Sequence, residues 1–158
     1  MPAVTGLLAG KRLLVTGVLT EASIAFAVAR LAQEQGAQIL LSGFGRGLSI
    51  TTRIAGRLPQ AAEVVELDVT DEGHLDGLAR VLRDRLGGCD GVLHAIGFAP
   101  EAALGGNFLT ASWADVATAV QVSTYSLASL SRAALPAMDG GGSIVGLDFD
   151  ASVAWPAY

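Results

Sequence analysis

The sequence predicts an α/β fold built on one doubly wound, parallel sheet. Two observations predict it. Five short apolar segments, of the kind that form buried strands, alternate along the chain with four longer segments of helical character. The chain has 158 residues, of which 51% are hydrophobic, which is enough for one domain with a sizeable core. Such alternation is typical of right-handed βαβ units that share a parallel sheet.

The first half of the chain supplies two strands and two helices. The segment RLLVTG (12–17) is a compact apolar run that ends in glycine, which favours a buried strand. A helix is expected over 23–37, with Gly36 as its C-terminal glycine cap. Its apolar stripe consists of Ile24, Val28 and Leu31. The segment QILLSG (38–43) predicts the second strand, and a Gly-rich turn then leads into a short amphipathic helix over 48–58.

The second half continues the same alternation. AEVVELDV (62–69) predicts the third strand, and 71–86 a helix that opens with acidic residues and lies on the sheet. One face of that helix carries Leu75, Leu78, Val81 and Leu82. GVLHAIG (91–97) predicts the fourth strand, 112–138 a long helix rich in small residues, and SIVGLDF (143–149) the fifth strand after a glycine turn.

Composition excludes several classes of function. The net charge is -5 and the ten Lys and Arg form no run, so we expect no nucleic-acid surface. We expect neither a targeting segment nor a membrane span, since no apolar run reaches 18 residues, and therefore a soluble, cytoplasmic protein. The lone Cys89 cannot form an internal disulfide, and no cluster of metal ligands surrounds it. We interpret it as a small buried hydrophobe.

The first turn between strand and helix, TGVLTEASIA, lies where a doubly wound fold binds a dinucleotide pyrophosphate. The fingerprint G-x-G-x-x-G is absent. Gly17 alone takes the tight-turn position, and the hydroxyl of Ser23 at the helix start is a candidate phosphate donor. On spacing alone, a plain helix N-cap at Ser23 is the favoured interpretation.

Four motifs, in order, carry a resemblance to a known family. They are the turn above, LDV (67–69), HAIGFAP (94–100) and SIVGLDFDASVAWPAY (143–158). Together they resemble the NADH-dependent enoyl-acyl-carrier-protein reductases of the actinobacterial and mycobacterial type, a divergent branch of the short-chain dehydrogenase/reductase superfamily. The resemblance covers essentially the whole chain, and it implies a dinucleotide-binding domain of the Rossmann type over 1–158.

The resemblance also implies which residues bind the cofactor. Gly17, Ser23 and Ile24 would hold the pyrophosphate, and Phe44 would flank the adenosine. Asp68 and Val69 would contact the adenine, and Val122 with Ser123 would lie behind the nicotinamide ribose. The cofactor would also approach the end of the fourth strand, at Ala95, Ile96 and Gly97. Without the resemblance, Asp68 is better explained as the cap of the next helix. His94 is expected to be a buried strand residue and His74 a solvated helix residue.

The usual acid that binds the ribose 2′-hydroxyl is missing, because no Asp or Glu occurs between Gly36 and Ala62. The resemblance favours NADH, whereas the charge pattern leaves NADPH open. Arg46 could attract a 2′-phosphate, although GFGRG is equally consistent with a flexible surface turn.

The family's chemistry is the reduction of a trans-2-enoyl thioester, carried by acyl carrier protein or CoA, in fatty-acid elongation. Tyr158 matches the tyrosine that donates a hydrogen bond to the thioester oxygen, and Phe149 the ring beside the nicotinamide. The family's active-site lysine, seven residues further on, has no counterpart in this sequence. We therefore expect an incomplete domain that lacks its C-terminal strands and helices. The resemblance implies a homotetramer, and a complementing chain is the other possibility.

Two alternatives stay open at this point. The chain could be a truncated, non-catalytic module that binds a dinucleotide or a partner and requires a second chain. It could also keep the fold and reduce another substrate, as reductases of antibiotic pathways do.

Overall fold

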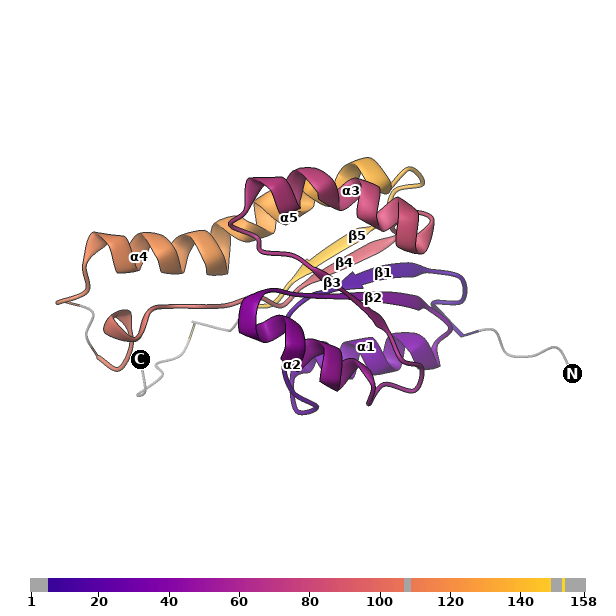
Figure 1. The fold of residues 1–158 in the computed structure, drawn as a ribbon, viewed down its shortest axis with the longest axis horizontal. Coiled ribbons are helices and arrows are strands. Elements are labelled where there is room, and N and C mark those ends of the chain that lie inside the picture. The colour runs from indigo at the N-terminus through magenta and orange to yellow at the C-terminus, as the bar shows by residue number, and fades with distance from the viewer. Residues whose placement is uncertain (1–5, 107–108, 149–151, 153–158) are drawn as a thin grey trace, which may run out of the picture.

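A five-stranded parallel sheet forms the centre of the chain, as predicted (Figure 1). The computed structural model describes residues 6–106, 109–148 and 152. The strands are β1 (Arg12–Val15), β2 (Gln38–Gly43), β3 (Glu63–Glu66), β4 (Gly91–His94) and β5 (Ser143–Gly146). Their order in the sheet is β3-β2-β1-β4-β5, and every neighbouring pair is parallel. The order reverses direction between β1 and β4, which defines a doubly wound, Rossmann-type sheet.

Helices cover both faces of this sheet. They are α1 (Ile24–Glu34), α2 (Gly45–Ala55), α3 (Glu72–Leu86), α4 (Trp113–Val120) and α5 (Ser126–Ala134). Figure 1 shows α1 and α2 on one side of the sheet and α3 and α5 on the other, with α4 projecting away from both. In agreement with this position, α4 has no buried residue.

The core consists of two layers, one on each face of the sheet, because side chains alternate along each strand. Leu14 of β1 and Leu40 of β2 pack toward α3 and α5. Val15 and Leu41, the next residues in each strand, pack toward α1 and α2. Cys89 is fully buried in the first of these layers, and burial raises the pKa of its thiol. The interpretation of this cysteine as a buried hydrophobe is confirmed.

Of the apolar stripe expected on the first helix, Val28 packs against the core, whereas Ile24 and Leu31 lie largely outside it. Ile24 is 64% exposed and Leu31 is 51% exposed. The buried residues of α1 that pack against the sheet are instead Ala25, Phe26, Ala29 and Ala32. Alanine lacks the bulk that would hold the helix away from the strands, so small side chains can form the inner face while larger ones lie outside.

Two predicted helix boundaries are also wrong. The Gly-rich stretch is the first turn of α2, which begins at Gly45 and not at residue 48. Glycine has a low helix propensity, but the first turn of a helix needs few internal hydrogen bonds, so glycine is tolerated there. The long helix expected over 112–138 is interrupted by a π-helical turn, Gln121–Tyr125, and ends in a short 3-10 turn, Leu135–Ala137.

β5 is an edge strand whose two faces are unequally covered. Ile144 packs into the core layer beneath α3 and α5. Val145 points to the opposite face and is 52% exposed, because α1 and α2 do not extend over it.

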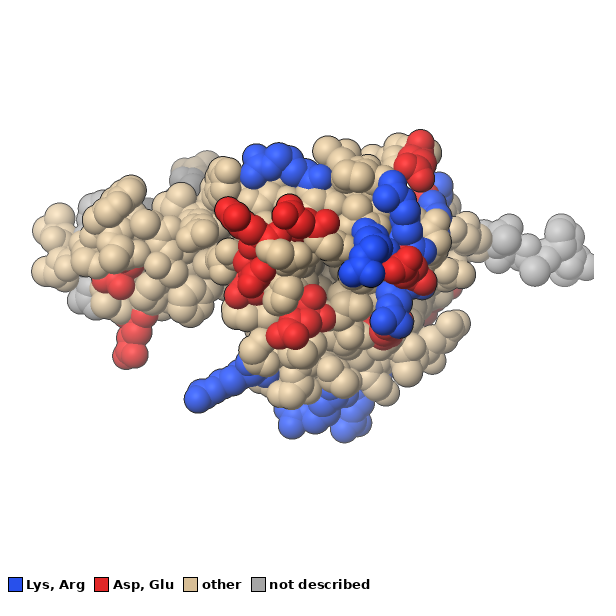
Figure 2. All heavy atoms as spheres, turned by 45° about the horizontal axis from the view of Figure 1, so that its top comes forward, with Lys and Arg blue, Asp and Glu red and all other residues tan. Residues whose placement is uncertain are grey.

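No helix within the described residues has the length and apolar character needed to cross a membrane. On the face shown in Figure 2, acidic and basic side chains occur in small groups of both signs. Ion pairs such as Arg85–Glu63, at 3.1 Å, and Arg30–Glu34, at 4.0 Å, join some of them.

Candidate functional site

A cavity of about 560 Å³ opens at the carboxyl ends of the strands, where the strand order reverses. In doubly wound folds, ligands bind in the crevice at this switch point. Of the eleven cofactor residues that the resemblance implies, eight line the cavity: Gly17, Phe44, Asp68, Val69, Ala95, Ile96, Gly97 and Val122. The strands are shorter than predicted at this end, because residues 67–69 and 95–97 leave the ladder and form the wall of the cavity.

The turn after β1 requires glycine at position 17. The φ angle of Gly17 is +77°, and a β-carbon there would lie 1.9 Å from the carbonyl oxygen of Ala95. The neighbouring Thr16 is buried, and its Oγ1 donates to the Leu93 carbonyl and accepts from the Ala95 amide, both at 2.9 Å. The ends of β1 and β4 are therefore fixed in close contact, with the cavity directly above them.

Ser23 and Ile24 are not on the cavity wall. Ser23 is the N-cap of α1, because its Oγ accepts a hydrogen bond from the Phe26 amide at 3.1 Å. The same hydroxyl donates to the Thr20 carbonyl at 2.7 Å. The interpretation of Ser23 as a helix cap is thus confirmed, and the phosphate-binding roles of both residues stay predictions.

The second wall of the cavity comes from the end of β2 and the start of α2. Phe44 occupies the N-cap position of α2 and lines the cavity with its half-exposed ring. The buried Thr51 donates from Oγ1 to the Val18 carbonyl at 2.9 Å, which ties α2 to the turn after β1. Neither Thr16 nor Thr51 was identified from the sequence as a site residue.

Asp68 is at the end of β3, but it is not a helix cap. Its Oδ1 accepts hydrogen bonds from the amide of Thr70 at 2.8 Å and from the Thr70 hydroxyl at 2.7 Å. The cap of α3 is Asp71, whose Oδ1 accepts from the His74 amide at 3.0 Å, and this bond lowers the pKa of Asp71. The interpretation of Asp68 as the cap of the next helix, which the sequence favours without the resemblance, is therefore wrong.

His74 is also more than a solvated helix residue. Its Nδ1 accepts a hydrogen bond from the backbone amide of Asp68 at 3.0 Å. The imidazole therefore fixes the backbone of a residue that lines the cavity, and it can do so only while Nδ1 carries no proton. No sequence pattern predicts this contact, because the acidic neighbours of His74 indicate a solvent-exposed position.

His94 is buried in β4, as expected from the strand pattern, with 3% of its surface exposed. Its Nε2 lies 2.7 Å from Oγ of Ser126, and Ser126 donates to the Val122 carbonyl. Since the serine proton is used in that bond, we infer that Nε2 of His94 is the donor to Ser126. Burial lowers the pKa of His94, which favours the neutral ring. The contact joins β4 to the helix that carries Val122.

The π-helical turn between α4 and α5 holds the loop after β4. Oγ of Ser123 accepts from the Phe98 amide at 2.9 Å and donates to the Phe98 carbonyl at 2.8 Å. Phe98 and Val122 both line the cavity. π-helical turns inside α-helices are frequent at functional sites, and this one places Val122 on the wall where the sequence predicted a ligand contact.

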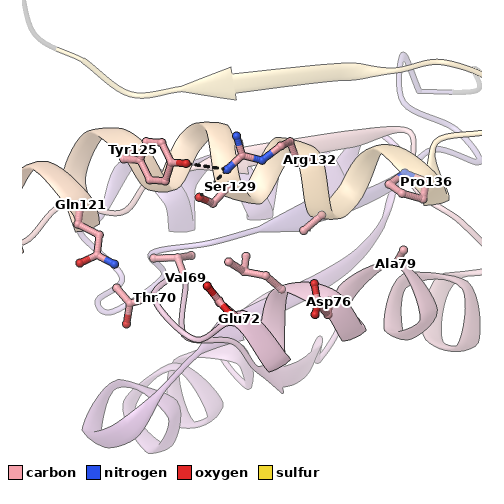
Figure 3. A pocket seen from close by; sticks show the side chains of 12 residues that line it. Val69, Thr70, Glu72, Asp76, Ala79, Gln121, Tyr125, Ser129, Arg132 and Pro136 are labelled. Atoms are coloured by element: carbon pink, nitrogen blue, oxygen red, sulfur yellow. Dashed lines mark hydrogen bonds between the residues drawn. The ribbon is translucent and has the colours of Figure 1, made fainter.

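A second hollow, of about 480 Å³, lies between α3 and α5 (Figure 3). Arg132 lines it from α5, with its guanidinium 5.4 Å from the centre of the Tyr125 ring and 3.1 Å from the Tyr125 hydroxyl. Figure 3 shows Glu72 and Asp76 on the opposite side, from α3. Val69, Thr70 and Gln121 line both hollows. The second hollow is therefore a polar groove behind the wall of the first, and its cation already has partners.

Tyr158 and Phe149, the predicted catalytic residues, lie outside the described residues. Within the part of the chain that the structure describes, no three His, Cys, Asp or Glu side chains are grouped so as to hold a metal ion.

Comparison with known proteins now decides the family. Residues 17–158 match the family model described as "Enoyl-(Acyl carrier protein) reductase". The chain belongs to the enoyl-(acyl carrier protein) reductase family. An NADH enoyl-acyl-carrier-protein reductase of Mycolicibacterium smegmatis is 51% identical over 98% of this chain, and one of Mycobacterium avium is 48% identical over 97%. The corresponding reductase of Neisseria meningitidis is 36% identical over 97%.

The match to these reductases is partial on their side. This chain spans 58% of the length of the two mycobacterial enoyl-acyl-carrier-protein reductases and 60% of the one from Neisseria. The predicted resemblance to the mycobacterial type of this family is confirmed by both identities.

Proposed function

We propose that the cavity at the switch point binds NADH, and that the whole protein reduces the trans-2 double bond of enoyl thioesters on acyl carrier protein or CoA. The observation that carries the proposal is the gathering of eight predicted cofactor residues around one cavity, in a chain whose relatives are named as NADH-dependent reductases. Fatty-acid elongation in the cytoplasm is the setting that we propose for this activity.

The cavity wall fits a dinucleotide at two points. Apart from the chain neighbours of Gly97, no atom of the described residues lies within 4 Å of the position that a β-carbon there would take, so the backbone is open to a ligand. The turn at Gly17 packs on Ala95 without any side chain between them, which brings the two backbones of the wall together. We propose that these glycines allow the close approach of the pyrophosphate and of the nicotinamide half.

On the adenine side we propose Asp68 and Val69. One carboxylate oxygen of Asp68 is held by Thr70, and the backbone amide of Asp68 is held by His74. A carboxylate fixed in this way can accept a hydrogen bond from the adenine amine without reorganising, which strengthens binding. We expect Phe44 to pack on the adenosine from the opposite wall.

When bound, NADH would supply a hydride to the β-carbon of the enoyl thioester, negative charge would then develop on the thioester oxygen, and a proton from solvent at the α-carbon would complete the reduction. We propose that the Tyr158 hydroxyl donates a hydrogen bond to that oxygen, an interaction that is stronger in the transition state than in the ground state. Phe149 is proposed to exclude water beside the reacting atoms. Both assignments rest on the resemblance of SIVGLDFDASVAWPAY to the family motif.

The test is NADH oxidation by the purified full-length protein with crotonyl-CoA and longer trans-2-enoyl thioesters. We expect oxidation only when the thioester is present. Tyr158→Phe should lower kcat by about 100- to 1000-fold, the usual effect of removing one such donor, and leave the Kd for NADH unchanged. Binding of NADH without reduction of any enoyl thioester would contradict the proposed reaction.

The exposed edge at β5 favours a second candidate, a binding module that works with another chain or another copy. Val145 is 52% exposed and Leu147 is 43% exposed on and beside this edge strand. Unpaired strand edges are sites for pairing with further strands. Size exclusion of the purified protein separates the two cases. A monomer that reduces enoyl thioesters excludes the module, whereas an inactive chain that gains activity with a partner supports it.

A further inference from the structure

We propose that the cavity also accepts a 2′-phosphorylated dinucleotide, and that Arg46 is the residue that selects for the phosphate. The inference rests on the proposed dinucleotide function of the cavity and adds NADPH to the cofactors that it takes. It follows from the charges on the wall formed by β2 and α2.

That wall carries no carboxylate. The residues of β2 and α2 that line the cavity are Ser42, Gly43, Phe44, Arg46, Gly47 and Thr51. In sites that select the unphosphorylated cofactor, an acid at this place binds the ribose 2′-hydroxyl and repels a 2′-phosphate. Among the described residues that line the cavity, Asp68 is the one acid, and it lies beyond the end of another strand, β3, with one oxygen bound to Thr70. Nothing on the β2–α2 wall therefore repels a phosphate.

Arg46 is the one basic residue among the described lining residues, and its charge is not neutralised. Its guanidinium makes no hydrogen bond or ion pair with any described residue, in contrast with Arg12, which is bound to Asp90. Arg46 is in the first turn of α2, a turn without an acidic residue. Guanidinium groups bind phosphate oxygens through paired, charge-assisted hydrogen bonds. A free arginine on the rim is thus available for a 2′-phosphate.

Substitutions at two positions, Gly47 and Arg53, can distinguish an effect of charge on phosphate binding from an effect of side-chain shape. Gly47 lines the cavity, and a β-carbon there would meet only Leu19 Cδ2, at an ordinary 3.6 Å. Gly47→Asp therefore introduces the missing acid, and Gly47→Asn fills the same space without charge. Arg53 is an exposed arginine in the last turn of the same helix and does not line the cavity. Arg53→Gln is accordingly the matched control for Arg46→Gln.

The experiment is an equilibrium titration of the purified full-length protein with ADP-ribose and with 2′-phospho-ADP-ribose. Neither probe contains nicotinamide, so the result is independent of the reductase chemistry. We expect the two Kd values to agree within about fivefold. Arg46→Gln should weaken the binding of 2′-phospho-ADP-ribose by about five- to tenfold and leave the Kd for ADP-ribose unchanged. Arg53→Gln should change neither.

Gly47→Asp is expected to weaken 2′-phospho-ADP-ribose by about tenfold or more through repulsion, whereas Gly47→Asn should leave the ratio of the two Kd values near its original value. The proposal is overturned if ADP-ribose binds and 2′-phospho-ADP-ribose binds more than about fivefold more weakly, or if Arg46→Gln leaves the ratio unchanged. If neither probe binds, the nucleotide site itself is wrong and both proposals fall together.

Discussion

Replacing Gly17 by alanine tests the packing that forms the cavity. Two costs follow from the structure. A residue with a β-carbon at a φ of +77° loses about 1–2 kcal/mol to backbone strain. The new carbon would also lie 1.9 Å from the Ala95 carbonyl oxygen, so the end of β4 must move by roughly 1 Å before the contact is tolerated. That movement breaks the hydrogen bonds of Thr16 to Leu93 and Ala95, at about 1 kcal/mol each.

The summed loss for Gly17→Ala is about 3–4 kcal/mol, a large part of the stability of a domain of this size. Gly10→Ala is the matched control, because Gly10 has a φ of +74° and, apart from its chain neighbours, no atom of the described residues within 4 Å of its β-carbon position. Urea unfolding of both variants gives the free energies of unfolding. We expect Gly10→Ala to lose about 1–2 kcal/mol, from strain alone. Equal losses in the two variants would refute the reasoning, since the contact with Ala95 would then cost nothing.

Three further predictions concern buried or paired polar groups. Burial lowers the pKa of His94 below its ordinary 6.5. The stability that depends on the neutral ring is therefore fully present above pH 6.5, and the free energy of unfolding falls as the pH drops below that value. His94→Gln should remove this part of the dependence in urea titrations between about pH 5 and 8. The hydrogen bonds from Arg12 lower the pKa of Asp90 to about 2, so their stabilisation is present above about pH 3.8 and is lost as the pH falls toward 2. Acid unfolding of Asp90→Asn should lack that step, and an unchanged acid transition would count against it. Thr16→Val should destabilise the fold by about 1–3 kcal/mol, because the Ala95 amide loses its acceptor, while Thr16→Ser should retain most of the stability in the same thermal or urea assay.

Much of the fold was predictable because each strand is indicated by a short, contiguous stretch of sequence. Short apolar runs between turn signals indicate the strands of a parallel sheet, and the structure has all five strands within the predicted ranges. The inner face of α1 was not predictable in the same way. Periodicity ranks large apolar residues first, whereas the sheet lies against Ala25, Ala29 and Ala32 and leaves Ile24 outside. Which stripe faces the sheet is decided by how closely the helix can approach, and that depends on distant residues.

The residues of the candidate site also fall into those that local sequence predicts and those that depend on distant contacts. Gly17 was predictable because a tight turn after a strand requires a positive φ, which is a local property. Thr16 and Thr51 were not, because their hydroxyls bond to carbonyls 77 and 33 residues away in the sequence. A threonine in an apolar run has no local signal that separates such a bond from simple packing. His74 was missed for a similar reason, since its acidic neighbours are close in sequence but its partner is the Asp68 backbone.

Cofactor binding and reduction can be tested separately in this protein. The residues proposed to hold the adenosine half, Asp68 and Phe44, line the described cavity, whereas Tyr158, proposed to act on the thioester, lies outside the described residues. If the protein binds ADP-ribose but reduces no thioester, the cavity is still a nucleotide site, and the binding-module alternative is favoured over the reductase. If the protein reduces thioesters, and Gly97→Val lowers both its affinity for the dinucleotide and its rate of reduction, then the cavity binds the cofactor of that reaction. Because, apart from the chain neighbours of Gly97, no atom of the described residues lies within 4 Å of its β-carbon position, that loss would come from the ligand and not from the fold.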